Sequence, residues 1–116
     1  MKVLALIYGE EGRWDSATGD ERNAVYERYR AFGQQAGDKV VDGAELASTR
    51  TATTVRVRDG ETSVTDGPFA ETKETLGGFY LLECGDLEEA AALAALIPGA
   101  ATGAVELRPA AEEESS

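Results

Sequence analysis

The chain contains no histidine and a single cysteine, and each shortage removes a class of chemistry. Without imidazole the commonest general base and a leading metal ligand are missing, so acid–base catalysis would fall to Asp, Glu, Lys or Tyr side chains. Cys84 cannot form a disulfide within the chain, and it lies in an apolar run that favours a buried, inert thiol over a reactive one. No metal-binding spacing, P-loop, nucleophile elbow or dinucleotide fingerprint is present. We therefore expect neither a metal nor a cofactor.

Long hydrophobic runs and positive charge are also scarce. The apolar run Val3–Tyr8 is too short for a signal peptide, and no stretch is long enough to span a membrane. Lys and Arg number 11 against 22 Asp and Glu, which gives a formal net charge of -11. A field of that sign repels phosphate backbones. We expect a cytoplasmic protein that binds neither nucleic acid nor a membrane.

The remaining composition is that of an ordinary globular domain. The 116 residues suit one domain, and 42% hydrophobic residues with 28% charged residues are enough to form one core. We expect this domain to cover residues 1–109. The acidic segment 110–116 is expected to form a disordered tail.

Two segments are apolar on both faces of an extended strand. In Val3–Tyr8 and in Phe79–Cys84 the odd and the even positions are both hydrophobic. Strands of this kind are covered on both sides, so these two are predicted to be central in a sheet. Weaker strand patterns cover Lys39–Leu46 and Ala104–Arg108.

Two capping signals predict two helices. Thr18 and Glu21 have capping-box spacing, and the helix that they begin is expected to end near Ala36. Its apolar side chains form one stripe, made of Val25, Tyr29, Phe32 and Ala36. Asp86 and Glu89 repeat the capping spacing before a second helix, which a Pro-Gly pair at 98–99 is expected to end.

A hairpin is predicted between the third and fourth extended segments. Thr53–Arg58 and Glu61–Thr65 alternate in polarity and are joined by an Asp-Gly pair, which is a strong turn signal. We expect Val55 and Val57 to face inward.

The order of these elements predicts an α+β fold. A β-α-β-hairpin-β-α-β chain with its first and third main strands central matches the ferredoxin-like split βαβ sheet. Two helices cover only one face of such a sheet. A second subunit packing sheet to sheet would cover the other face, so we expect a homodimer. The alternative is that the hairpin folds over that face within one chain.

The stretch VTDGPFAETKETLGGFY, residues 64–80, concentrates the candidates for chemistry. Asp66 is the candidate base, and Glu71 and Lys73 are candidates for holding a small polar molecule, with Lys73 positioning an anion. The alternative is structural. In that case Asp66 bonds backbone amides within an Asp-Gly-Pro turn, Phe69 anchors the turn in the core, and the remaining charges are solvated.

Two aromatic residues outside this stretch are further ligand candidates. Trp14 lies in the expected loop Gly9–Ala17, where it would either stack on a ligand or cover the sheet edge or the dimer seam. Tyr8 ends a central strand, where pockets of open sheets tend to lie, although core packing is the alternative.

The stretch VTDGPFAETKETLGGFYLLE at 64–83 resembles the signature of the YCII-related family, in its DGPF-motif branch. Further matching stretches are KVLALIYGEEGRW, VVDGAEL, TATTVRVRDGETSVTDGPF and GAVELRP. The resemblance implies a ferredoxin-like fold that dimerises into an α/β barrel, with a pocket near the motif in each subunit. It implies no defined reaction, so whether the chain is an enzyme stays open.

The resemblance carries two further implications. Members of this branch are often encoded near extracytoplasmic-function sigma factors, which makes a non-catalytic regulatory or interaction module the alternative to ligand binding. Some relatives outside the branch are thought to use a His-Asp pair, which a chain without histidine cannot supply. The chain also departs from the pattern at Ile97-Pro98 and Ala101, where a cysteine-proline and an arginine are expected.

Overall fold

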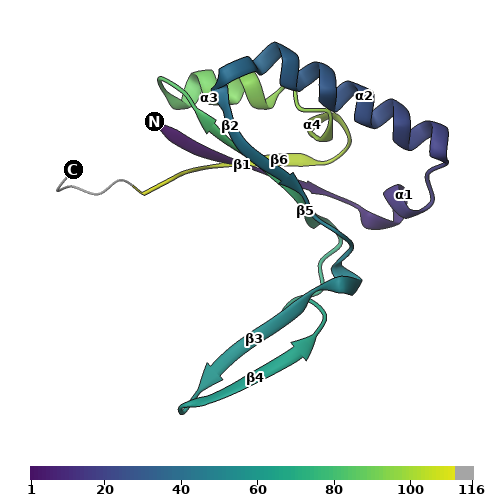
Figure 1. Cartoon of the computed structure of the whole chain (residues 1–116), viewed down its shortest axis with the longest axis vertical. Helices are drawn as coiled ribbons and strands as arrows, with labels where there is room; N and C mark the ends of the chain where they lie inside the picture. Colours follow the sequence, from purple (N-terminus) through teal and green to yellow (C-terminus); the bar gives the residue numbers. More distant parts are fainter. Residues whose placement is uncertain (112–116) are drawn as a thin grey trace.

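The computed structural model describes residues 1–111, shown in Figure 1. Its helices and strands are, in chain order, β1 (Lys2–Gly9), α1 (Glu11–Asp15), α2 (Gly19–Ala36), β2 (Val40–Glu45), β3 (Thr53–Arg58), β4 (Glu61–Asp66), β5 (Thr75–Glu83), α3 (Leu87–Ala94), α4 (Gly99–Thr102) and β6 (Ala104–Pro109). Of the expected acidic tail, residues 112–116 lie outside the described part.

The four main strands form one antiparallel sheet in the order β2-β5-β1-β6. The two strands that are apolar on both faces, β1 and β5, therefore occupy the centre, which confirms that prediction. This strand order and the α+β content are those of a ferredoxin-like fold. In the register of β1 and β5, Val3 lies opposite Leu82 and Leu4 lies opposite Leu81.

One face of this sheet forms the core with the helices. Figure 1 shows α2 and α3 on the same side of the sheet. The side chains of Val3, Ala5 and Leu82 are fully buried there. Phe32 of α2 and Ala90 of α3 pack against them in the same cluster. Small alanine side chains let α3 lie close to the strands.

Helix α2 begins and ends where the sequence predicts. The Glu21 backbone N–H donates to Thr18 Oγ1 at 3.1 Å, and the Thr18 N–H donates to Glu21 Oε1 at 2.9 Å. This is a complete capping box, which satisfies two N–H groups that lack helical partners. Gly37 ends the helix with φ of 58°, a value that favours glycine.

Two helical boundaries differ from expectation. The expected loop at 9–17 contains the short helix α1. The second main helix stops at Ala94, three residues before Ile97, because tight turns follow in which the Ile97 N–H donates to the Ala94 carbonyl. Pro98 then precedes α4 rather than only ending a helix, since proline fits the start of a helix where an N–H has no partner.

Strands β3 and β4 pair with each other in a separate two-stranded sheet, here called the ribbon. Asp59 and Gly60 connect them with positive φ angles of 52° and 79°, the conformation that Asp-Gly pairs favour in hairpins. Figure 1 shows the ribbon projecting away from the sheet, on the side opposite the helices. The ribbon therefore does not fold over the open face of its own chain.

The expectation of inward-facing valines was wrong for the single chain. Val55 and Val57 are 60% and 58% exposed, and Val64, which pairs with Val55, is 66% exposed. Phe69 is 79% exposed, so it does not anchor the turn in the core. The alternation of polar and apolar residues shows that one face of the ribbon is apolar, but it does not predict what covers that face.

The second face of the main sheet is also apolar. Leu4, Leu6, Phe79 and Leu81 share this face and are only partly buried. Within residues 1–111, Figure 1 shows no helix on this side. No helix in that part of the chain is both long and apolar enough to cross a membrane.

Truncating Leu82 tests the position of the core. Leu82→Ala should lower the free energy of unfolding by about 3 kcal/mol, because it leaves a cavity among fully buried side chains. Leu87→Ala is the matched control, since Leu87 is 46% exposed at the start of α3 and should change stability by less than about 1 kcal/mol. Urea denaturation of the two variants measures both values. Equal losses would contradict this assignment of the core.

Candidate functional site

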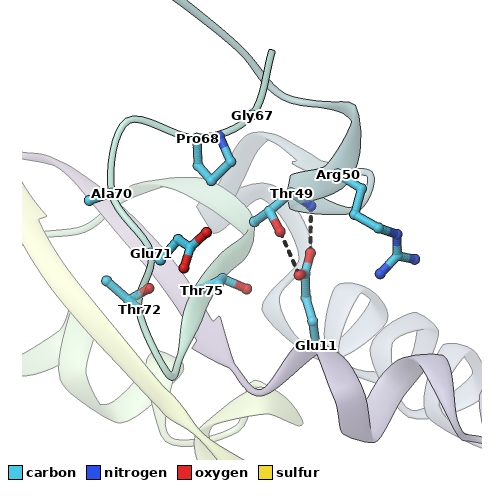
Figure 2. Close-up of a pocket in the computed structure, with 9 residues that line it drawn as sticks. All are labelled: Glu11, Thr49, Arg50, Gly67, Pro68, Ala70, Glu71, Thr72 and Thr75. Carbon is cyan, nitrogen blue, oxygen red and sulfur yellow. Dashed lines mark hydrogen bonds between the residues drawn. The ribbon is translucent and has the colours of Figure 1, made fainter. Parts of the chain in front are cut away.

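A small cavity lies beside the segment that contains the DGPF sequence. Its volume is about 310 Å³. The lining residues, drawn in Figure 2, are Glu11, Thr49, Arg50, Gly67, Pro68, Ala70, Glu71, Thr72 and Thr75. We call this space the motif cavity. Its lining is rich in hydroxyl and carboxylate groups, which suits a polar occupant rather than a hydrocarbon one.

One wall of the motif cavity is fixed by a bond between distant parts of the chain. The Thr49 backbone N–H and hydroxyl both donate to the Glu11 carboxylate, each at 2.6 Å. These bonds hold the pKa of the Glu11 carboxyl below its ordinary value, with the Thr49 hydroxyl as the largest cause and its N–H as the next. The Glu11–Thr49 pair connects α1 to the turn that leads into the ribbon.

Glu71 is the carboxylate that faces the motif cavity. Figure 2 shows its side chain pointing into the space bordered by Pro68, Thr49 and Thr75. No other group within residues 1–111 forms a hydrogen bond or ion pair with the Glu71 carboxylate. Arg50 points away in the same view, and its guanidinium pairs with Asp15 at 3.1 Å.

The other residues predicted from the motif lie apart from Glu71. Asp66 is the last residue of β4, is exposed, and is not among the residues that line the motif cavity. Lys73 is also outside the lining; its side chain is 85% exposed, with Nζ 3.8 Å from Glu10 Oε1. The structure therefore does not bring these three ionisable groups together at one point.

The turn itself is held by backbone geometry. Gly67 has φ of 95°, in the region that favours glycine, and its N–H donates to the Ala52 carbonyl at 2.7 Å. The Thr54 hydroxyl donates to the Gly67 carbonyl at 2.7 Å. These bonds tie the turn to the start of β3. The Asp66 side chain takes no part in them.

Tyr8 and Trp14 line a second, larger cavity of about 940 Å³. We call it the α2 cleft, because α2 forms one wall and strands of the main sheet form another. It adjoins the motif cavity, since Glu11 and Thr75 line both. Trp14 meets the Tyr26 ring edge to face, with 5.4 Å between ring centroids.

Sequence reasoning named Tyr8 but missed the Glu11–Thr49 pair and the other tyrosines of the α2 cleft, Tyr26, Tyr29 and Tyr80. Glu11 and Thr49 are 38 positions apart, and neither belongs to a recognisable motif. Tyr29 was assigned to the apolar stripe of α2, and its partial burial fits that assignment, but its hydroxyl also reaches the cleft lining. Within residues 1–111 no group of three or more metal-ligating side chains is placed to hold a metal ion.

The Glu11–Thr49 pair predicts a pH-dependent contribution to stability. Because folding lowers the pKa of Glu11 from 4.5, this contribution is present above about pH 4.5 and is lost as the pH falls through the folded pKa. In a carboxyl NMR titration, Glu11 should therefore titrate below 4.5. Thr49→Val should raise its midpoint, and Thr49→Ser, which keeps the hydroxyl, should not. A wild-type midpoint at or above 4.5 would refute the pairing.

Comparison with known proteins identifies the family of this chain. The model of the YCII-related domain matches residues 1–114. A protein of Rhizobium meliloti (strain 1021), named "Uncharacterized protein R00369", is 41% identical over 119 residues, covering 94% of this chain and 91% of that protein. Since the match extends over nearly the whole sequence, the chain belongs to the YCII-related domain family.

Proposed function

We propose that this YCII-related chain is a member of the DGPF-motif branch that binds a small polar molecule in the motif cavity. The observation that carries the proposal is the Glu71 carboxylate, which points into a cavity lined by hydroxyl groups and has no hydrogen-bond or ion-pair partner within residues 1–111. A charged group in such a position favours a ligand that donates hydrogen bonds. The cytoplasm is the proposed compartment.

The lining narrows the chemistry of the ligand. Three threonines, at positions 49, 72 and 75, line the cavity. The hydroxyls of Thr49 and Thr72 already donate to the Glu11 carboxylate and to the Glu74 carbonyl, so toward a ligand they can act only as acceptors. Arg50 is paired with Asp15, and Lys73 lies outside the lining, beside Glu10. A neutral or cationic molecule with several hydroxyl or amino groups matches this surface better than an anion does. Binding of an anion would require the Lys73 side chain to turn into the motif cavity.

Asp66 remains the proposed base if the bound molecule reacts. Asp66 and Glu71 are both exposed, but only Glu71 lines the motif cavity, so the binding role of Glu71 has more support than this role. The two carboxylates therefore have separable parts in the proposal, with Glu71 in binding and Asp66 in turnover. We assign no reaction type.

We further propose that the chain acts as a homodimer that packs sheet to sheet as an α/β barrel. Both uncovered apolar surfaces, the open sheet face and the ribbon, lie on the side away from the helices (Figure 1). A single second copy related by a two-fold axis can therefore cover both at once. Apolar sheet faces that pack together lie about 10 Å apart and bury alternate side chains of each strand.

The alternative function is a non-catalytic interaction module linked to extracytoplasmic-function sigma factors. The observation in its favour is the exposed row of Val55, Val57 and Val64 on the ribbon, which is a surface suited to a protein partner. A purified extracytoplasmic-function sigma factor should then be retained by the immobilised wild-type protein. Retention by a Val55→Asp, Val57→Asp variant at the wild-type level would contradict this use of the ribbon.

A thermal-shift screen of polyols, amino sugars and amines tests the binding proposal. At least one compound should raise the melting temperature, and calorimetry should then give an affinity about tenfold weaker for Glu71→Gln, because one charged hydrogen bond is lost. Asp66→Asn is the matched control within the same motif. It should leave both the affinity and the melting temperature close to wild type while abolishing any turnover.

Two outcomes would overturn this proposal. One is a screen without a stabilising compound. The other is a ligand whose affinity is unchanged by Glu71→Gln. If Asp66→Asn unfolds the protein instead, Asp66 has a structural role in its turn and the assignment as a base fails.

A further inference from the structure

The α2 cleft is larger and less polar than the motif cavity, and the proposed function leaves it unused. Its volume of about 940 Å³ lies near the upper end of the roughly 300–1,000 Å³ range of small-molecule sites. Aromatic residues line it from four elements: Tyr8 of β1, Trp14 of α1, Tyr26 and Tyr29 of α2, and Phe79 and Tyr80 of β5. Aromatic side chains pack well against other aromatic rings, so this lining favours an aromatic ligand.

The Trp14 side chain in the lining of the cleft is held in place by its neighbours. The Arg22 guanidinium lies 5.3 Å from the centre of the Trp14 ring and donates to the Trp14 carbonyl from Nε and Nη2, at 3.2 Å and 3.0 Å. Tyr26 approaches the same ring edge to face, and its hydroxyl donates to Glu45 at 3.2 Å. Because these contacts already order the indole, a ligand would not have to supply that ordering.

Two glycines make room for the inner tyrosines. A Cβ atom at Gly43 would lie 2.7 Å from the Tyr80 ring, and one at Gly99 would lie 2.9 Å from the Tyr29 hydroxyl. Both distances are shorter than carbon atoms tolerate, so larger residues at these positions would displace the tyrosines. The positions of both phenols thus depend on a glycine in a neighbouring element.

The inner tyrosines also supply polar groups. Tyr29 and Tyr80 are partly buried, and burial is the largest cause of the raised pKa of each phenol, so both stay protonated at neutral pH. The Tyr80 hydroxyl makes no hydrogen bond to another group within residues 1–111. A partly buried hydroxyl without a partner can orient a polar substituent of a ligand.

The charges around the cleft favour one sign of ligand. Five carboxylates and three guanidiniums line it: Glu10, Glu11, Asp15, Glu21 and Glu45, with Arg13, Arg22 and Arg28. Arg22 already donates to backbone carbonyls, and each of the five carboxylates is engaged with a partner as well, so the preference rests on the surplus of two carboxylates over guanidiniums. An anionic ligand would meet a negative surface here, whereas a cation would gain from both the acids and the rings.

We infer that the α2 cleft is a second binding site, which takes a planar aromatic molecule that is neutral or positively charged and carries a polar group that reaches Tyr29 and Tyr80. This site does not depend on the polar ligand proposed for the motif cavity. Because Glu11 and Thr75 line both spaces, the two ligands would bind side by side.

Calorimetric titration of the full chain with three matched probes tests this inference: 1-naphthylmethylammonium, 1-naphthalenemethanol and 1-naphthoate. They share one ring system and differ in charge. The cation and the alcohol should bind saturably, and the carboxylate should bind about tenfold more weakly or not at all. Absence of saturable binding by all three, or tightest binding of 1-naphthoate, would overturn the inference.

Variants locate the site and separate it from the motif cavity. Val25 lines the cleft from α2, so Val25→Trp should fill the space and abolish binding of the naphthyl probes. Tyr29→Phe keeps the ring and removes the hydroxyl, so the alcohol should bind about fivefold to tenfold more weakly to that variant. Phe69→Ala, at an exposed position outside the cleft, is the control and should leave binding unchanged.

Glu71→Gln distinguishes the two proposed sites. It should leave the naphthyl affinity at the wild-type value, even where it weakens a polar ligand. If Val25→Trp and Tyr29→Phe both bind the probes with wild-type affinity, the probes bind elsewhere and the α2 cleft is not the site.

Discussion

The constraint on which the rest of the structure depends is that the sheet is apolar on both faces while the chain has helices for only one of them. Val3 and Leu82 face α2 and α3, and their neighbours Leu4 and Leu81 face the other way. Shifting either central strand by one residue would exchange these sets. The same alternation leaves a hydrophobic surface on the outside of the single chain.

The two candidate sites occupy places where this packing is loosest. The last turns of α2 contribute the buried Phe32 and Ala36 to the core, whereas Val25 and Tyr29, which come earlier in the helix, line an open cleft. The motif cavity forms where the chain leaves the sheet for the ribbon and returns to it. There the Glu11–Thr49 pair replaces hydrophobic packing as the connection between segments. Polar bonds of this kind leave room for a ligand, which a close-packed core does not.

Local signals in the sequence were sufficient for much of the fold. The capping box at Thr18 and the turn at Asp59-Gly60 act within four residues, and the two-faced strands identify themselves by composition, so all three were predictable. The exposure of Val55 and Phe69 was not predictable, because it depends on which other surface covers these side chains and not on their neighbours in the sequence. Glu71 lines the motif cavity and Asp66 does not, a difference that the charges of the motif alone do not reveal.

The central claim is that a second copy of the chain covers the open sheet face and the ribbon. Sedimentation equilibrium over a wide range of protein concentration tests it most directly, because it reports mass without depending on shape. The account predicts a mass of twice the 12.3 kDa of one chain. A mass of 12.3 kDa at every concentration would contradict it and would leave the apolar face exposed to water or to a different partner.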